Sequence, residues 1–380
     1  MNRIGKNTVF LLLLALWAGG MTAYGQDTVR VLFAGDLMQH EPQLLSAATD
    51  SGRYDYSESF RYVAPGIKRA DIAIANLETP LGAPPYSGYP RFSAPPAFAR
   101  AARDAGFDVL VTANNHSLDQ YKRGVVRTVE VLDSLGIPHT GVFRDTAERR
   151  ERYPLLFHRG GLRFALLDYT YGTNGIPHRP PTFVNRIDTA QIRTDLAQAR
   201  ALRPDFVLVC IHWGQEYRML PDDAQKALGV FLMDNGADVV IGSHPHVVQP
   251  MHALRDSTGR IRHVLAYSLG NYLSNQRTVD TQGGATVTVD FVRDGLGKAR
   301  IAGCSYALVW MWKPVDAASA RQHFYILPVP EAQRGDFPLS AEEKSRLDAF
   351  ARHARDLFSR HNTDVPEEKR PEETAAATGK

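Results

Sequence analysis

Short apolar segments alternate with amphipathic segments through most of the chain, and this alternation limits the fold more than any other feature. The apolar segments are Val29–Ala34, Ile72–Ala75, Val109–Thr112, Phe164–Leu167, Phe206–Ile211, Val239–Ile241 and Val264–Tyr267. The intervening segments with helical spacing include Ala97–Ala105, Val125–Leu135, Thr189–Ala201 and Asp223–Asn235. Strands that alternate with helices predict an α/β architecture with layered sheets. Thr286–Val292 and Arg300–Val309, joined by a glycine-containing turn, predict an antiparallel hairpin on the same core.

Polar side chains follow six of the predicted strands at the point where each strand ends. These residues are Asp36, Glu78, Asn114-Asn115-His116, His212, His244-Pro245-His246 and Asn271. In open α/β sheets, ligands bind outside the carboxyl ends of the strands. We therefore expect these side chains to meet at one edge of the fold.

Carboxylate, amide and imidazole groups in this combination predict a metal site. They suit a divalent ion such as Mn, Fe or Zn better than a metal that prefers thiolates. There are more ligands than one four-coordinate ion needs. Two ions about 3.5–4 Å apart, bridged by a carboxylate, would use them all and would suit phosphate-ester hydrolysis. One ion is the alternative.

Each of these motifs also has a structural interpretation when it is taken singly. An aspartate directly after a strand, such as Asp36, is often a turn residue. Asn114-Asn115-His116 resembles an ordinary loop sequence. The pair His244 and His246 is harder to explain in this way, because two buried imidazoles without partners are costly. The combination at successive strand ends favours the metal site.

The charge balance and the missing motifs exclude several other functions. The chain has 44 Lys and Arg against 41 Asp and Glu, and without Arg3 and Lys6 the balance is 42 against 41. A near-neutral chain gives no broad nucleic-acid footprint. The sequence has no nucleophile elbow, Walker loop or Rossmann glycine pattern, which argues against serine hydrolases, NTPases and dehydrogenases. Cys210 and Cys304 lie in apolar segments and are expected to be small core residues; whether their strands are neighbours stays open.

No linker divides residues 28–330, and we expect them to form one domain. The two ends of the chain differ from this domain. Residues 1–25 are predicted to be a signal peptide, because Arg3 and Lys6 precede the apolar run Val9–Ala18 and a small-residue cleavage site follows. We therefore expect export to the periplasm or cell surface. An uncleaved signal would instead anchor the protein in the membrane.

At the other end, residues 338–361 are predicted to form an amphipathic helix. Ser340-Ala341-Glu342-Glu343 has the form of a capping box. Leu347, Phe350, Ala354 and Leu357 follow at helical spacing. Residues 363–380 are rich in Pro, Glu, Lys, Thr and Ala, and we expect a disordered tail there.

Taken in order, the strand-end motifs resemble a known family. The motifs are Gly35-Asp36-x-Met38, Asn76-x-Glu78-x-Pro80, Asn114-Asn115-His116, His212-x-Gly214-x-Glu216, Gly242-Ser243-His244-Pro245-His246-Val247 and Ser268-Leu269-Gly270-Asn271. Over residues 28–275 they resemble the bacterial capsule-synthesis family CapA, named for poly-γ-glutamate capsule biosynthesis. That family is similar to the calcineurin-like metallophosphoesterases. The resemblance therefore implies a four-layered α/β/β/α sandwich with a two-metal site.

The resemblance also implies a role for each residue at the strand ends. The implied ligands are Asp36 and His246 for the first metal, Asn115, His212 and His244 for the second, and Glu78 as the bridging carboxylate. His116 would donate a proton to the leaving oxygen instead of binding metal.

The chain departs from the phosphoesterase pattern at two of these positions. Met38 stands where the phosphoesterases have a histidine, so the first metal loses an imidazole that only His40, at a different spacing, could replace. Glu78 stands in place of an aspartate. The CapA family shares Met38 and Glu78, so these differences bear on phosphoesterase activity and not on family membership.

Other residues near the motifs are candidates for substrate binding. The proline-rich segment 82–96 would present Arg91 and Tyr89 to an anionic substrate, because guanidinium pairs with carboxylate or phosphate; the alternative is a plain surface cover. Asn271 is a further candidate, and with Gln249 it would reach the metal-bound water or else cap a loop. Glu216 would orient His212 or be exposed.

Two functions of different class follow from these residues. The first is a metal-dependent hydrolase that acts on a phosphoester or a γ-glutamyl amide, with metal-activated water and His116 as the proton donor. The second is a non-catalytic component that binds the polymer or assists its export. In both cases the expected partners are an anionic cell-surface polymer or a phosphoester substrate, together with membrane proteins of capsule assembly and without nucleic acid.

Overall fold

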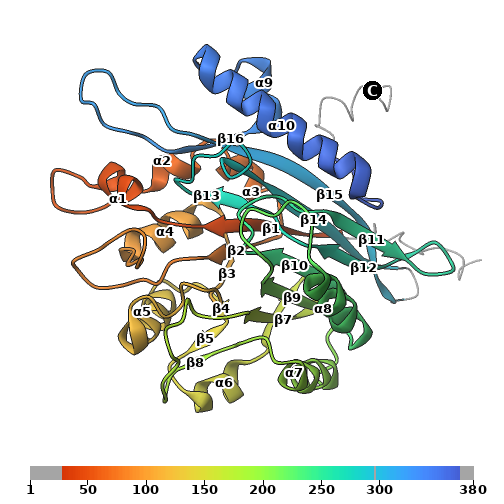
Figure 1. The fold of residues 1–380 in the computed structure, drawn as a ribbon. Coiled ribbons are helices and arrows are strands. Elements are labelled where there is room, and N and C mark those ends of the chain that lie inside the picture. Colours follow the sequence, from red (N-terminus) through yellow and green to blue (C-terminus); the bar gives the residue numbers. More distant parts are fainter. Residues whose placement is uncertain (1–27, 295–296, 369–380) are drawn as a thin grey trace, which may run out of the picture.

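The core of the protein is a pair of β-sheets stacked face to face (Figure 1). The computed structural model describes residues 28–294 and 297–368. The first sheet has the order β16 (Tyr325–Pro328), β15 (Ala299–Trp312), β14 (Gly283–Arg293), β1 (Val29–Leu37), β2 (Ile72–Leu77), β3 (Val109–Val111), β4 (His139–Thr140), with β13 (Asn271–Leu273) beside β1. The second has the order β11 (Met251–Arg255), β12 (Ile261–Ala266), β10 (Val239–Ser243), β9 (Phe206–His212), β7 (Leu162–Thr170), β6 (Leu155–Arg159). A short pair, β5 (Val142–Phe143) and β8 (Phe183–Val184), lies apart from both.

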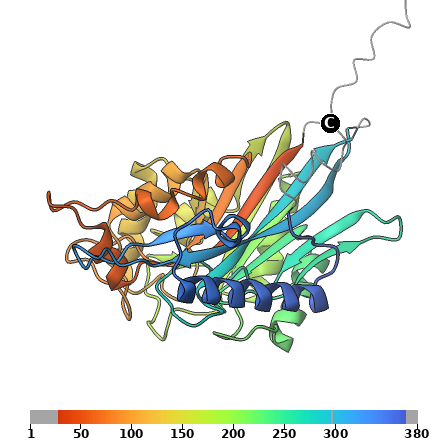
Figure 2. The same ribbon diagram turned by 90° about the horizontal axis from the view of Figure 1, so that it is seen from above.

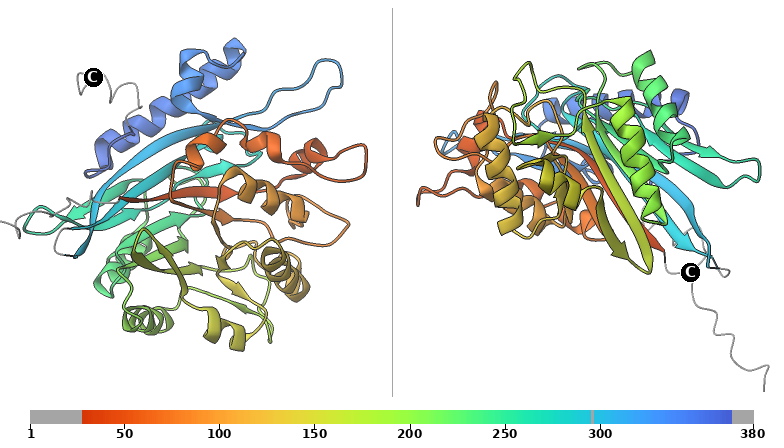
Figure 3. Two further views of the ribbon diagram at one scale, coloured as in Figure 1. Left: turned by 180° about the vertical axis from the view of Figure 1, so that it is seen from behind. Right: turned by 90° about the horizontal axis from the view of Figure 1, so that it is seen from below.

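Helices cover the outer faces of the two sheets, as the views in Figure 3 also show. The first sheet is covered by α1 (Glu41–Ala47), α2 (Ser57–Phe60), α3 (Ala64–Ile67), α4 (Pro96–Ala105) and α5 (Tyr121–Ser134). The second is covered by α7 (Thr189–Ala201) and α8 (Asp223–Asp234), while the remaining helices are α6 (Thr146–Arg152), α9 (Val329–Arg334) and α10 (Ala341–His361). The layers are thus α/β/β/α, which confirms the predicted four-layered α/β fold.

Alternation of side chains along each strand builds these layers. In β1, Val31 and Phe33 face the second sheet, whereas Leu32 and Ala34 face the helices. Because both faces are covered, the strand is apolar along its length, as is typical of buried parallel strands. Phe291 of β14 joins the sheets, with its ring centroid 5.2 Å from that of Phe164 and 4.5 Å from that of Phe206.

Parallel strands occupy the middle of both sheets. In the first sheet β1, β2, β3 and β4 run parallel, and in the second β7, β9, β10 and β12 do so. The predicted hairpin is present as the antiparallel pair β14 and β15, whose register runs from Gly283↔Trp310 to Arg293↔Ala299. The parallel strands end at one common edge, where the predicted site residues meet.

The long C-terminal helix lies along β15 (Figure 2). It begins with the capping box, in which Ser340 Oγ accepts the backbone N–H of Glu343. Its apolar side packs on the face of β15 that also faces the second sheet, and Tyr306 meets Phe358 edge to face at 4.6 Å. The helix therefore extends the second layer beyond the edge of the smaller sheet.

The first residues of the expected tail are part of the fold. Thr363 forms a bridge with His252 of β11, and Glu367 forms a bridge with Tyr306 of β15. Arg355 of α10 pairs with Glu367 at 2.7 Å. Residues 363–368 thus belong to the folded structure, because their backbone hydrogen-bonds to strands that are distant in sequence. Residues 369–380 lie outside the described residues.

Three other expectations concern the cysteines and the N-terminus. Cys210 is buried in β9, whereas Cys304 of β15 is partly exposed; they lie in different sheets and both are free. The predicted signal peptide, residues 1–25, lies outside the described residues. Within residues 28–294 and 297–368, no helix combines the length and apolar character needed to cross a membrane.

Candidate metal centre

The predicted ligands come together where the parallel strands of both sheets end. Two groups of side chains place their ligand atoms within 4.8 Å of one another: Glu78, His244 and His246, and Asp36, Glu78 and His212. All five residues are buried. Glu78 belongs to both groups, which is the position expected of a bridging carboxylate.

A close approach between β1 and the residue before β13 places Asp36 in this site. The register of β1 against β2 shifts between Ala34 and Asp36, so the strand bends there. A Cβ atom on Gly35 would lie 2.0 Å from the carbonyl oxygen of Gly270, so only glycine fits. The N–H of Asp36 donates to that same oxygen at 3.0 Å. The bend therefore brings Asp36 beside Asn271, its register partner.

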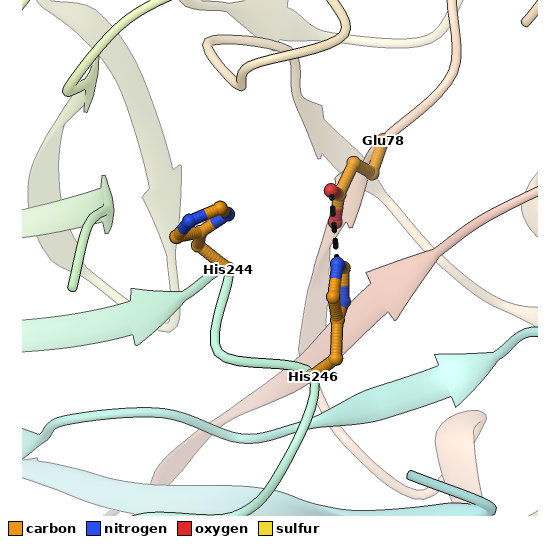
Figure 4. A group of neighbouring side chains, drawn as sticks. All are labelled: Glu78, His244 and His246. Atoms are coloured by element: carbon orange, nitrogen blue, oxygen red, sulfur yellow. Dashed lines mark ion pairs between the residues drawn. The ribbon is translucent and has the colours of Figure 1, made fainter. Parts of the chain in front are cut away.

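The Glu78 carboxylate is buried without a hydrogen-bond donor. Neither Oε1 nor Oε2 has a hydrogen-bond partner among the described residues, and the same is true of His244 Nδ1. The nearest imidazole nitrogens to Oε1 are His212 Nε2 at 3.5 Å and His246 Nε2 at 3.8 Å. Figure 4 shows the carboxylate of Glu78 pointing at His246, with the ring of His244 facing the same space. Buried polar atoms are nearly always satisfied, so these unpartnered atoms fit a bound cation.

The electrostatics of the cluster also fit a cation. Burial raises the pKa of Glu78 well above its ordinary value, and the neighbouring charge of Asp36 raises it further. Burial lowers the pKa of His212 and His244, to which the other imidazoles add. Neutral imidazoles present lone pairs to a metal, and a divalent ion would stabilise the ionised form of Glu78.

The turn that carries the two histidines has an unusual backbone. His244 has a φ of 97° and His246 a φ of 58°, both in the left-handed region that residues other than glycine rarely adopt. Pro245 separates them, and the N–H of His244 points at Asp36 Oδ2 across 3.4 Å. Such strain is typical of functional sites, and here it turns both imidazoles toward Glu78.

Several predicted ligands are held by hydrogen bonds from residues to which the sequence analysis assigned no individual role. Asn76 donates to Asp36 Oδ1 at 2.8 Å, and Asn114 in turn donates to Asn76 at 3.3 Å. Ser243 Oγ lies 2.8 Å from His212 Nδ1. All three lie inside the motifs given above, and their position next to a predicted ligand in the sequence could have indicated this role. Hydrogen bonds of this kind fix the orientation of metal ligands.

His212 and Asn115 contact each other directly. Asn115 Oδ1 lies 3.0 Å from His212 Nε2. Glu216 does not orient His212: its side chain is exposed, and Ser243 has that role. The reason is that the chain turns outward at Gly214, after β9 ends.

Two more predicted site residues act behind the ligands. Asn271 Oδ1 accepts the N–H of His246 Nδ1 over 3.1 Å, and its amide N–H groups donate to the Gln276 side chain and the Thr281 carbonyl. Its amide is thus used within the protein, so it positions His246 instead of contacting substrate. Gln249 donates to the Arg218 carbonyl at 2.7 Å. Of its two predicted roles, this contact fits the capping of a loop.

His40 does not replace the imidazole that Met38 lacks. Its Nδ1 lies 3.3 Å from Gln43 Oε1 and accepts the N–H of Asn275, and it is absent from both ligand groups. Met38 is buried, with 2% of its surface exposed.

His116 lies beside the cluster with its own carboxylate. Its Nδ1 is 2.7 Å from Asp119 Oδ2, and both side chains are buried. The ring meets Phe92 edge to face at 4.6 Å. Asp119, which also accepts the Phe92 N–H at 2.8 Å, was missed by the sequence analysis; its place three residues after His116 was the only signal.

The proline-rich segment reaches the same region. Arg91 donates from Nε and Nη2 to the Asp119 carbonyl at 3.2 and 3.0 Å, and its guanidinium lies 4.4 Å from the ring centroid of Tyr121. Tyr89 is 71% exposed. Arg91 is therefore anchored next to the His116–Asp119 pair, and Tyr89 faces solvent above it.

Comparison with known proteins agrees with the geometry. The family model described as bacterial capsule synthesis protein PGA_cap matches residues 30–276, which include every ligand of the cluster. The chain belongs to the PGA_cap family. This confirms the resemblance to CapA, and the match covers both sheets up to β13.

Two curated relatives of this PGA_cap protein are identical to it at about a quarter of the aligned residues. The PGA biosynthesis protein CapA of Bacillus subtilis (strain 168) is 27% identical over 318 residues, covering 77% of each chain. The capsule biosynthesis protein CapA of Bacillus anthracis is 26% identical over 275 residues, covering 69% of this chain and 63% of the relative. Among solved structures, a 5'-nucleotidase from Candida albicans aligns at 11% identity with a TM-score of 0.42, covering 86% of this chain and 57% of the other.

The cluster predicts a measurable metal content. Purified protein incubated with Mn, Zn or Fe should hold about one or two equivalents, and the variant His244→Ala/His246→Ala should lose them because both imidazoles face Glu78. Elemental analysis measures this directly. His353→Ala, which removes a partly exposed histidine of α10, is the control and should retain the metal. A parent protein without metal would contradict the site.

The raised pKa of Glu78 predicts an unusual pH dependence in the metal-free protein. Folded Glu78 keeps its proton at pH values where an unfolded glutamate, with a pKa of about 4.3, has lost it. The folded state then binds more protons, so stability falls as pH rises above that value. In EDTA, the denaturation midpoint of the wild type should therefore fall between pH 5 and 8 relative to that of Glu78→Gln. Glu342→Gln, at an exposed position, should follow the wild type; parallel profiles for all three would exclude the effect.

Proposed function

We propose that the protein is an exported, metal-dependent hydrolase of cell-surface polymer metabolism. The observation that carries this proposal is the buried, unpartnered carboxylate of Glu78 between His244 and His246. The hydrogen-bonded pair of His116 and Asp119 lies at the same strand ends. A ligand cluster for a cation and a buried acid–base pair together support hydrolysis.

The cation would be held by the residues gathered at the strand ends. These are Asp36, Glu78, Asn115, His212, His244 and His246, as one or two ions of Mn, Fe or Zn. When bound, such an ion supplies Lewis acidity and lowers the pKa of water to near neutrality.

His116 is suited to donate a proton to the leaving group. With Nδ1 directed to Asp119, the proton for transfer sits on Nε2, and the carboxylate stabilises the charged imidazole. Phe92 covers the ring and limits access of water to it. His116 lies close to the proposed ligands. Burial lowers the pKa of His212 most, the charge of His246 lowers it next, and the charge of His116 lowers it further.

The names of the relatives support an acidic polymer as the substrate class. The Bacillus relatives are named for PGA and capsule biosynthesis. The bond cut would be a phosphoester or a γ-glutamyl amide. Arg91 and Tyr89 lie next to the His116–Asp119 pair and would contact such an anion. Membrane proteins of capsule assembly are the expected partners.

A non-catalytic, polymer-binding role is the second candidate. The observation that favours it is Met38, which is buried at the position where phosphoesterases have an imidazole. A protein of this kind would keep the fold and a structural metal, and it would not need a proton donor.

The variant His116→Ala separates the two candidates. For a hydrolase, loss of the donor should lower the rate by about 10²–10⁴ with the metal content unchanged, because His116 belongs to neither ligand group. Activity would be followed on phosphodiesters and on γ-linked glutamate oligomers, with His353→Ala as the control. Full activity in His116→Ala would refute the proposed mechanism, and no activity in the parent on either substrate would favour the binding role.

Export predicts a shortened chain. Expression in a bacterium followed by mass spectrometry of the extracytoplasmic fraction should give an N-terminus at Gln26, because Ala23-Tyr24-Gly25 forms the cleavage site. A protein that retains Met1 in the membrane fraction would indicate an uncleaved anchor, and one found only in the cytoplasm would contradict export.

A further inference from the structure

A cavity lies at the N-terminal end of α10, away from the predicted metal ligands. Its volume is about 700 Å³, and it opens between α10, the end of β15 and the segment that precedes β14. The residues that matter on its wall are Arg277, Gln282, Trp310, Trp312, Lys313 and Arg346. This α10 cavity therefore combines three cations with two indole rings.

The three cations have no acidic partner. Within residues 28–294 and 297–368, none of Arg277, Lys313 and Arg346 forms an ion pair. Arg346 donates to Gln282 Oε1 at 2.7 and 3.1 Å and to the Arg277 carbonyl. Arg277 donates to Gln322 at 3.2 Å, and Lys313 donates to the Gln276 carbonyl. Neutral oxygens thus orient the cations, and none of the three contacts a carboxylate directly.

Among the described residues, the two acids on the cavity wall form no ion pair with these cations. Glu343 Oε1 accepts the Trp312 indole N–H at 2.9 Å, and its Oε2 accepts the Ser340 N–H at 2.8 Å in the capping box. Glu342 is exposed at the rim. With Lys313 protonated, the three basic side chains on the wall exceed the two acidic ones by one charge.

Two further observations indicate that the cavity favours an anion. Burial, followed by the charges of Arg277 and Arg346, lowers the pKa of Lys313 to about 7. An anion between these groups would offset both effects. Trp310 is buried, and its Nε1 has no acceptor among the described residues, so the wall also offers a free N–H donor.

One segment separates the cavity from the metal ligands. Gln276 accepts the Asn271 amide with its side chain at 2.9 Å and the Lys313 ammonium with its backbone carbonyl. Asn271 in turn contacts His246 at 3.1 Å. The cavity and the ligand cluster therefore lie on opposite sides of residues 274–282 and share its hydrogen bonds.

We propose that the α10 cavity binds carboxylates of an acidic polymer, beside and separate from the metal centre. The shared chemistry is recognition of an oxyanion by guanidinium and ammonium groups, which form their strongest hydrogen bonds with charged acceptors. The cavity is much larger than one phosphate ion needs, which favours a polymer segment. The identity of the polymer rests on the proposed function; the presence of an anion site does not.

The experiment is a calorimetric titration with a γ-linked glutamate decamer. It uses the full protein carrying His116→Ala, in EDTA, so that neither hydrolysis nor metal contributes. Lys313→Met and Arg346→Gln should each raise Kd about tenfold, since each removes one charged contact. Arg352→Gln removes an exposed charge from the same helix and should leave Kd within about twofold of the unsubstituted value.

Further arms of the titration separate the sources of the anion and test folding. Inorganic phosphate and a decamer with amidated carboxylates should bind more weakly than the acidic decamer. Arg346→Lys keeps the charge and should retain most of the affinity, and thermal unfolding checks each variant. Equal affinity in Lys313→Met, Arg346→Gln and Arg352→Gln would overturn the site, as would binding of phosphate in preference to the decamer. Because catalysis is disabled throughout, failure of the proposed hydrolase leaves this result unaffected.

Discussion

The burial of Glu78 is the constraint on which the rest of the site depends. A carboxylate without a hydrogen-bond donor, beside a second carboxylate at Asp36, is unfavourable in a protein interior unless a positive charge compensates it. The surroundings of Glu78 provide imidazole nitrogens and no ammonium or guanidinium group: His212 and His246 are the ion-pair contacts that it makes among the described residues. The same arrangement that destabilises the metal-free protein is therefore the one that suits it to bind a cation. If the predicted cation binds, stability and metal binding are coupled through this single side chain.

The two stacked sheets hold the side chains of this cluster in place. Asp36 and Glu78 come from the first sheet, and His212, His244 and His246 come from the second. Each group is fixed by its own strand, and the inter-sheet core around Phe291 holds the two strand edges together. Gly35 allows the backbone of β1 to approach that of Gly270, which directly precedes β13. Rigid strands position the ligands more accurately than loops would, while the strained turn at His244 and His246 completes the cluster.

The position of the C-terminal helix gives the protein a second region of interest. By extending the layer of the second sheet along β15, α10 encloses the cavity that contains Arg346 and Lys313. The match to the PGA_cap model ends at residue 276, inside the segment that separates this cavity from the ligands. Residues 277–368 thus add to the family's matched region a hairpin, α9, α10 and the ordered residues 363–368. A basic cavity next to the candidate metal centre would suit the long anionic substrate proposed above, which needs contacts beyond the bond to be cut.

The sequence by itself determined the layers and the set of polar residues that meet at the strand ends. Short apolar runs and helical spacing are local patterns, so the strands, the hairpin and the capped helix at Ser340 could be predicted from neighbouring residues. The types of residue after each strand likewise indicated a metal site at one edge. Only the tertiary structure decided what each polar group contacts: Asp119 on His116, Ser243 instead of Glu216 on His212, Asn271 behind His246, and Thr363 against β11. The cations of the α10 cavity also come from distant segments. Such contacts join residues far apart in the chain, and their geometry depends on how the two sheets and α10 pack, which no local pattern records.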